Sequence, residues 1–264
     1  DKVPTLVRNP PWIRPVRFLF QLIGVVPGYR EVDISAAFLG FYSLFFAMLV
    51  ADAGYGAILL IGTLILRVRM KNIPRDLIRL LALLAGGTIV WGVLTGSYFG
   101  IAHLPAPLAA LRVGWLTDET NLMRLCFLLG SIHLTLAHAW SLLRALPSLT
   151  ALAQLGWIGL IWALYFLAGN MILGAALPAV VLPLSLASLG LIVLFMTPPR
   201  ALKTEWHNHM MLPLSVIGAF GDVVSYVRLF AVGSAGTAIS IAFNQMALAG
   251  GINSFGSGLS AALI

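Results

Sequence analysis

The feature that most constrains the fold is a stretch without charge, residues 145–199, which contains no Lys, Arg, Asp or Glu. As one helix it would be about 80 Å long at about 1.5 Å per residue, whereas a bilayer's hydrocarbon core is about 30 Å thick. The stretch must therefore cross a membrane twice, with Gly174–Pro178 as the best position for the turn. Only 9% of residues are charged and the mean hydropathy is +0.97. These values exclude a soluble domain and predict an all-α, polytopic transmembrane protein.

The remaining apolar runs bring the prediction to about eight helices. The run from Ile34 to Leu66 is broken at Asp52–Gly56, and Asp52 is placed to cap the helix that follows it. The run from Met210 to Leu248 exceeds the length of an upright span, so we expect this helix to be tilted. Residues 1–33 are expected to form a polar, proline-rich cytoplasmic lead-in that lies partly on the membrane surface, and 34–264 the transmembrane ion-translocating domain. The expected helices lie at about 34–51, 54–68, 77–100, 121–143 and 210–248, twice within 145–199, and from Leu259 to the chain end, where the last is incomplete.

The distribution of basic residues predicts the orientation of the chain. Most of the 16 Lys and Arg residues fall in 1–33, 67–79 and 200–203, with Arg144 at the end of another apolar run. The positive-inside rule assigns these segments, and with them the N-terminus, to the cytoplasm. The net charge of +7 therefore reflects membrane topology and does not indicate nucleic-acid binding. The single cysteine, Cys126, lies in an apolar run, so no disulfide framework is expected.

Arg228 is the residue that most strongly indicates function. It is the only Lys or Arg after Lys203 and has more than ten mostly apolar residues on each side. An arginine near the bilayer centre costs about 2.5–3.5 kcal/mol on insertion scales, so a carboxylate or a water-lined cavity must stabilise it. The only carboxylates within the apolar regions are Asp52 and Asp222. Asp222 is six residues away, about 120° around the helix, which favours a carboxylate supplied by another subunit.

The helix that carries Arg228 is predicted to present a face of mostly small side chains. Small residues allow a second helix to approach closely in lipid, although packing against this chain's own helices is the alternative. The residues that share this face on helical spacing are Arg228, Ala231, Val232, Ala235, Ile239 and Ala242.

Polar residues elsewhere in the apolar regions are candidates for an ion path. Asp52 is a candidate for the outer side, with helix capping as the alternative. His133, His138 and Glu205 are candidates for a proton relay, with hydrogen-bonded packing or a solvated loop as alternatives. No catalytic residue, metal site or cofactor is predicted, and no GxxxxGK[ST] or GxGxxG motif is present, so any ATP chemistry belongs to a partner. The candidates near Arg228 are Asp222, Ser225 and Tyr226 on its cytoplasmic side, and Ser234, Thr237, Ser240, Asn244 and Gln245 on its outer side.

Several motifs resemble one family. Gly221–Ala231 resembles the GD-x-LSY-x-RL-x-AL signature in the membrane domain of the rotary V/A-type ATPase stator subunit, called subunit I in bacteria and archaea and subunit a in eukaryotes. Phe45–Gly56 is similar to its FFG-x-M-x-GD-x-GYG signature, with alanines in place of two glycines. Pro4–Trp12 and Trp91–Gly100 also fit, so the resemblance runs along the whole chain. Gly236 stands where eukaryotic members have a histidine, which favours the prokaryotic branch.

The resemblance implies a static, non-catalytic subunit that forms ion half-channels against the proteolipid c-ring. Arg228 would face the carboxylates of the rotor, and Ala231, Val232, Ala235 and Ile239 would line the same contact. Translocation of H⁺ or Na⁺ would be coupled to ATP synthesis or hydrolysis on partner subunits. Family members also have a cytoplasmic N-terminal domain that reaches the peripheral stalk, and a complete last helix with a second arginine. Neither is found within these residues, so the resemblance predicts part of a longer bacterial or archaeal subunit in the cell membrane.

Two other classes of function are alternatives to this one. A self-contained secondary transporter or channel would use Arg228 to bind an anionic substrate. Such a protein often shows an internal repeat or paired broken helices, whereas only one broken segment, Asp52–Gly56, is evident here. A purely structural membrane anchor is disfavoured because it gains nothing from a charge within the membrane.

Overall fold

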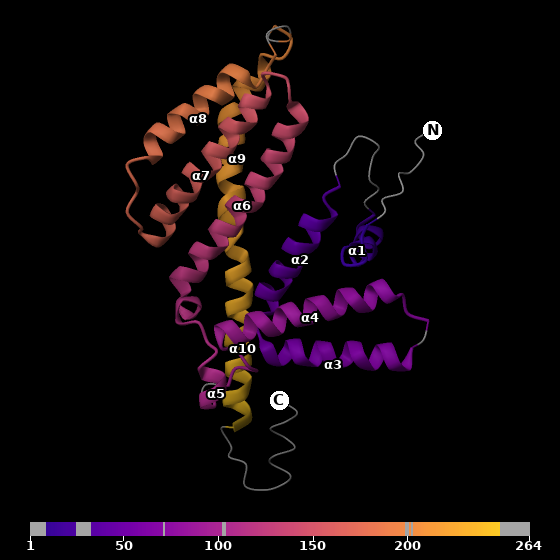
Figure 1. The fold of residues 1–264 in the computed structure, drawn as a ribbon. Coiled ribbons are helices and arrows are strands. Elements are labelled where there is room, and N and C mark those ends of the chain that lie inside the picture. The colour runs from indigo at the N-terminus through magenta and orange to yellow at the C-terminus, as the bar shows by residue number, and fades with distance from the viewer. Residues whose placement is uncertain are drawn as a thin grey trace. The chain divides into compact units, whose positions relative to one another are not determined.

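A computed structural model describes residues 9–24, 33–70, 72–101, 104–198, 201 and 203–248 (Figure 1). Within these ranges the chain forms helices and connecting turns and contains no strand, which confirms the predicted all-α fold. The helix expected from Leu259 lies outside the described residues. The elements are α1 (Val16–Ile23), α2 (Ser35–Val50), α3 (Ala53–Arg69), α4 (Arg75–Thr95), α5 (Ala106–Ala109), η1 (Gly114–Thr117), α6 (Glu119–Ala145), α7 (Ala151–Leu173), α8 (Val181–Phe195), α9 (His207–Ser225) and α10 (Val227–Leu248).

Several of these helices have the length and composition of membrane spans. Among the described residues, four helical segments are long and apolar enough to cross a bilayer: α4, α6, α7 and the segment His207–Ala247, which comprises α9 and most of α10. Helices α2 and α8 are also apolar but have 16 and 15 residues. The chain is therefore a polytopic helical membrane protein.

The breaks between helices follow local chemistry, and two were predicted correctly. Ala51, with φ 52°, and the extended Asp52 separate α2 from α3, while Gly174, with φ 65°, ends α7. The predicted helix over 77–100 instead ends at Thr95. Gly96, with φ 76°, accepts the left-handed conformation there and its backbone N–H bonds to carbonyls of the last turn.

The single helix expected over 210–248 is the main difference from the sequence prediction. It is interrupted at Tyr226, where α9 gives way to α10. The Tyr226 backbone N–H bonds to the carbonyl of Val223 at 3.4 Å, three residues back rather than four. The sequence has no glycine or proline next to Tyr226 that would break a helix, so the interruption was not predicted.

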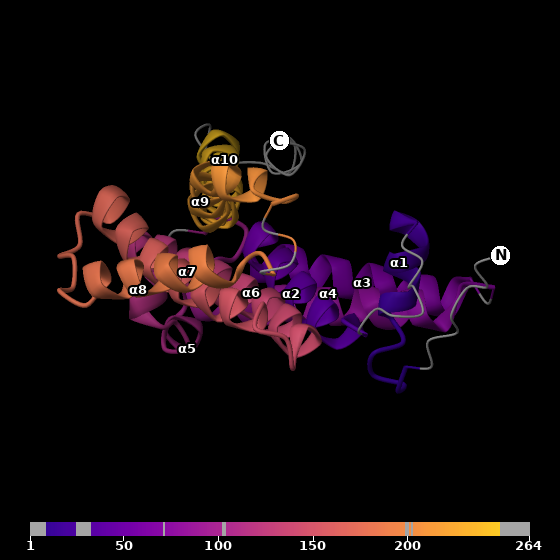
Figure 2. The same ribbon diagram turned by 90° about the horizontal axis from the view of Figure 1, so that it is seen from above.

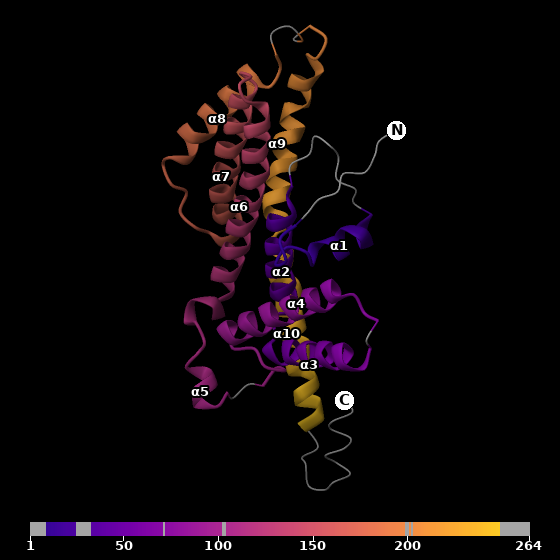
Figure 3. The same cartoon turned by 45° about the vertical axis from the view of Figure 1, so that its right-hand side comes forward.

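The chain forms two compact units, and the first comprises residues 1–118 and 229–264. Its core joins α1, α2 and α4. Helices α3 and α4 form a hairpin in which they lie side by side, and α10 crosses that hairpin (Figures 1 and 3). These three helices cannot all lie along the membrane normal, and the tilt expected of the Arg228 helix stays a prediction. The buried core residues are Ile13, Val16, Leu19, Leu39, Leu80 and Leu84.

The second unit, residues 119–228, contains α6, α7, α8 and α9. Helices α7 and α8 run side by side (Figure 2), and Gly156 and Gly159 bring α7 close to Ser188 of α8. Such small-residue contacts favour helix association in lipid, where no hydrophobic driving force acts between helices. The core residues shared among the four helices are Phe127, Leu160, Ile161, Leu164, Ala168, Ile192, Leu212 and Val223.

Candidate functional site

Arg228 lies at the second residue of α10 and its side chain is exposed. Its Nε donates a hydrogen bond of 3.1 Å to the backbone carbonyl of Ser225 at the end of α9. An arginine commonly stabilises the last carbonyls of a helix in this way. No carboxylate within the described residues forms an ion pair with Arg228. The guanidinium is therefore held by the backbone while most of its donors remain available to another group.

Helix α10 has one exposed face and one packed face. The predicted small-residue face is exposed along its whole length, including Val232 and Ile239 at 52% and 57%. On the opposite side Gly233 is buried against the carbonyl of Met48. Ser240 is also buried there. Within the described residues the alanine face is therefore left exposed, and its contact with another subunit stays a prediction.

Tyr226, at the helix interruption, is seated in a notch of α6. Its hydroxyl is hydrogen-bonded to Nδ1 of His133 at 2.6 Å, and the two rings meet edge to face. Gly130, one turn before His133, provides the space, because a Cβ there would collide with the Tyr226 ring. The structure thus brings together two residues that the sequence analysis treated as separate candidates.

We expect the Tyr226–His133 hydrogen bond to appear as a coupling in a double-mutant cycle. Tyr226→Phe and His133→Leu should each lower the thermal stability of the protein in detergent, and the double variant should be little worse than either. The expected coupling is about 1 kcal/mol, the usual net value of such a bond. His138→Leu is the matched control for the same cycle, because His138 bonds Gln154 instead. Additive effects of Tyr226→Phe and His133→Leu would contradict the proposed pairing.

Asp52 caps α3, as predicted. Its Oδ1 accepts hydrogen bonds from the backbone N–H groups of Gly54 and Tyr55 at 2.8 and 3.1 Å. Its Oδ2 accepts a third from the Ser97 hydroxyl at 2.8 Å. The residue is only 2% exposed. Both carboxylate oxygens therefore have structural partners, and a role of Asp52 in the outer ion path stays a prediction.

A second polar cluster joins the start of α3 and the segment after α4 to α10, and part of it was not predicted from the sequence. The Tyr55 hydroxyl is 3.1 Å from Oγ of Ser240, and its ring meets that of Phe99 edge to face. The Asn244 side-chain amide donates to the Phe99 carbonyl. Gly54 lies directly under the Phe99 ring. The segments Phe45–Gly56 and Trp91–Gly100, which each resemble the family, thus meet in space, and this contact was not predicted from the sequence.

The remaining candidates bond locally, pack against other side chains or are exposed. His138 bonds Gln154 at 2.8 Å and stacks on Trp157, which fits a packing role. Glu205, which lies just before α9, accepts a hydrogen bond from the side chain of Asn208 in the first turn of that helix. Asp222 is exposed, and its backbone carbonyl accepts a bond from the Ser225 hydroxyl. Two further candidates lie on α10: Ser234 bonds the Ala231 carbonyl and Gln245 is exposed.

Comparison with known proteins identifies close relatives. The chain is 34% identical to V-type ATP synthase subunit I 1 of Treponema pallidum, over 93% of this chain and 43% of that protein. It is 31% identical to V-type ATP synthase subunit I of Borreliella burgdorferi, over 94% of this chain and 44% of that protein. A-type ATP synthase subunit I of Methanocaldococcus jannaschii is 30% identical over 51% of this chain. No family model matches. The chain spans less than half the length of these relatives.

Proposed function

Because the chain belongs to the subunit I family of the V-type and A-type ATP synthases, we propose that it is the static membrane subunit that guides ions past a rotating proteolipid ring. The observation that carries this proposal is the position of Arg228. It is an exposed cation at the start of α10, has no carboxylate partner within the described residues, and begins a face of small exposed side chains. A rotor helix that packs closely on the small-residue face, and that carries a carboxylate to pair with Arg228, fits these features.

The chemistry follows from the guanidinium. It does not deprotonate in practice, so it favours the ionised form of each rotor carboxylate that passes. That carboxylate releases its ion before it reaches Arg228 and takes up another beyond it. The fixed positive charge also blocks a direct leak between two offset half-channels. Each charge that crosses is worth about 2.3 kcal/mol per 100 mV, and rotation transmits this free energy to ATP synthesis or hydrolysis on partner subunits.

Two groups of polar residues are proposed to line the half-channels. The cytoplasmic group surrounds the α9–α10 interruption and includes Asp222, Ser225 and Tyr226, with His133 as a proton relay through its bond to Tyr226. The outer group comprises Asp52 and the polar residues of α10, namely Ser234, Thr237, Ser240, Asn244 and Gln245. In this arrangement the N-terminus is cytoplasmic in a bacterial or archaeal cell membrane. The peripheral stalk and catalytic head would be reached through a domain outside this chain.

Cysteine cross-linking to the rotor tests the proposed contact. We expect Ala235→Cys to form a disulfide with a cysteine placed one turn from the ion-binding carboxylate on the outer rotor helix, because the exposed small-residue face allows close approach. The native Cys126 is buried, so it should contribute little background. The measurement is the yield of the linked product from oxidised membranes of the complete complex.

Thr237→Cys is the matched control for this experiment. Thr237 lies on the same helix, about 200° around it from Ala235, and its hydroxyl bonds back to Gly233. We expect no rotor cross-link from this position. A product from Thr237→Cys but not from Ala235→Cys would show that the opposite face of α10 meets the rotor. Absence of both products in an assembled complex would argue against the proposed contact.

A further inference from the structure

The turn between α3 and α4 encloses a hollow that the proposed function does not use. The hollow has a volume of about 600 Å³. It lies between the end of α3 and the start of α4, within one compact unit. Its lining combines arginines with apolar side chains, namely Arg67, Met70, Ile73, Arg75, Ile78 and Arg79. Such a mixture suits a ligand that has an anionic part and an apolar part.

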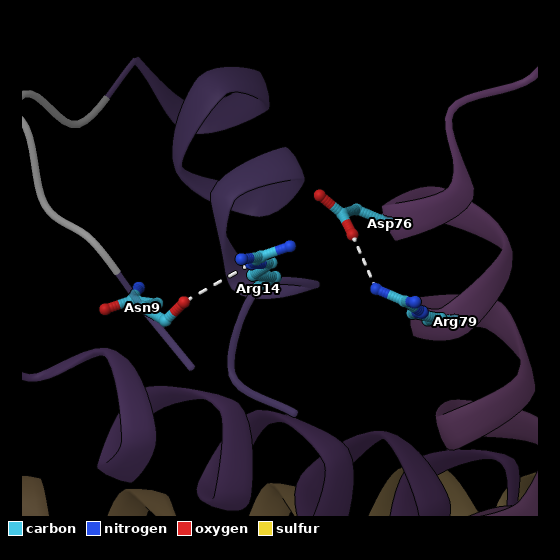
Figure 4. A network of polar contacts seen from close by, with 4 residues as sticks. All are labelled: Asn9, Arg14, Asp76 and Arg79. Atoms are coloured by element: carbon cyan, nitrogen blue, oxygen red, sulfur yellow. Dashed lines mark hydrogen bonds and ion pairs between the residues drawn. The ribbon is translucent and has the colours of Figure 1, made fainter. Parts of the chain in front are cut away.

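The charges around the hollow are only partly neutralised. Asp76 is 3.3 Å from Nη1 of Arg79. Figure 4 shows the two on successive turns near the start of α4, with Asp76 projecting to the side where Arg14 lies. No carboxylate in the described part of the chain pairs with Arg67 or Arg75. Both side chains are exposed. Two guanidinium groups therefore remain to bind an anion, and guanidinium matches the geometry of phosphate oxygens.

The neighbouring surface of α3 indicates that the anion belongs to a lipid. Ile58, Ile61, Ile65 and Val68 recur at helical spacing and are 55–75% exposed. This apolar stripe leads to Met70, which lines the hollow and is 54% exposed. In a membrane protein such a stripe contacts acyl chains, and basic pockets at its end bind lipid head groups. A soluble phosphate would gain nothing from the stripe.

We propose that the α3–α4 hollow binds the phosphate of an anionic phospholipid, with Arg67 and Arg75 on the head group and the acyl chains along the exposed stripe of α3. None of the residues that line the hollow belongs to the polar clusters described above, so the proposed site is distinct from the residues proposed for the ion path. It would fix this hairpin in the leaflet in which its basic turn lies.

Native mass spectrometry of the purified chain tests this site. We expect phosphatidylglycerol to bind more tightly than phosphatidylcholine. Arg67→Gln combined with Arg75→Gln should weaken phosphatidylglycerol binding about 25-fold, or about five-fold per arginine, the equivalent of about 1 kcal/mol per basic residue near an anionic surface. Binding of phosphatidylcholine should not change. Equal retention of both lipids by the unmodified chain would overturn the proposal.

Two controls separate this site from simpler explanations. Arg69→Gln removes an exposed arginine of the same helix that does not line the hollow, and it should alter binding less than two-fold, about the error of such comparisons. If it weakens phosphatidylglycerol as much as the double variant, the attraction is a general surface charge and no site exists. Glycerol phosphate is the soluble probe. If it binds as tightly as the lipid and with the same dependence on Arg67 and Arg75, the hollow binds free phosphate instead.

Discussion

Replacement of Arg228 by alanine is expected to abolish ion-coupled ATP synthesis and ATP-driven ion movement in the reconstituted complete complex. Without the guanidinium, nothing favours the ionised rotor carboxylate at the boundary between the half-channels. Removal of one partner from a desolvated charge pair typically costs about 3–5 kcal/mol, so coupled turnover should fall at least about 100-fold. The measurement is ion flux and ATP turnover in the same vesicles, with assembly checked on native gels.

Arg228→Lys distinguishes charge from geometry in the same experiment. A lysine keeps a positive charge but loses the planar set of donors, and it deprotonates much more readily in a site of low polarity. It also loses the Nε bond to the Ser225 carbonyl. We therefore expect Lys to be inactive as well. Retained coupling in the Lys variant alone would mean that charge suffices.

Arg144→Ala is the matched control. Arg144 lies in the last turn of α6, outside the apolar segment that carries Arg228, and its removal should leave coupling unchanged. If both Arg228 variants couple ATP turnover to ion movement like the unmodified protein, the rotor-facing role is wrong. A transporter in which Arg228 binds an anionic substrate would then become the better hypothesis, and substrate-dependent flux without ATP turnover would support it.

The set of residues that share a helix face with Arg228 was predictable because it depends on local rules. A lone arginine in a long apolar run must find a stabilising partner, and helical spacing alone identifies which residues share its face. The structure shows that this face, from Ala231 to Ala242, is exposed. The Asp52 cap was predictable for the same reason, since a carboxylate directly before an apolar run commonly binds the first backbone N–H groups of a helix.

Pairings between distant residues were not predictable. Tyr226 and His133 are 93 residues apart, and no local pattern links them. Gly130, one turn before His133, was the only sequence signal, because a glycine within a helix often marks a close approach. Ser97, which bonds Asp52 across 45 residues, carries no signal of its own. The helix interruption at Tyr226 was also not predicted. The sequence has no helix-breaking residue there, and the hydrogen bond from Tyr226 to His133 of α6 depends on tertiary packing.

Two glycines of α4 are expected to respond oppositely to the same substitution. Gly92 is buried where α4 meets the start of α3, and a Cβ there would overlap the Ala53 backbone nitrogen and the Asp52 carbonyl carbon. Backbone atoms cannot move aside as a flexible side chain can. The Ala53 N–H also donates to the Ser97 carbonyl at 2.9 Å. Gly92→Ala must therefore separate α3 from α4 and disturb the Asp52 cap.

The expected cost of Gly92→Ala is about 3 kcal/mol, the upper part of the usual range for overpacking, because the strain adds to the loss of the cap. Gly86→Ala lies on the same helix and is the matched control. No atom lies within 4 Å of a Cβ built at Gly86, so alanine there should be neutral or stabilise by up to about 1 kcal/mol through helix propensity. Thermal unfolding of the protein in detergent measures both. Equal unfolding midpoints for the two variants would mean that α3 and α4 are not held together through Gly92.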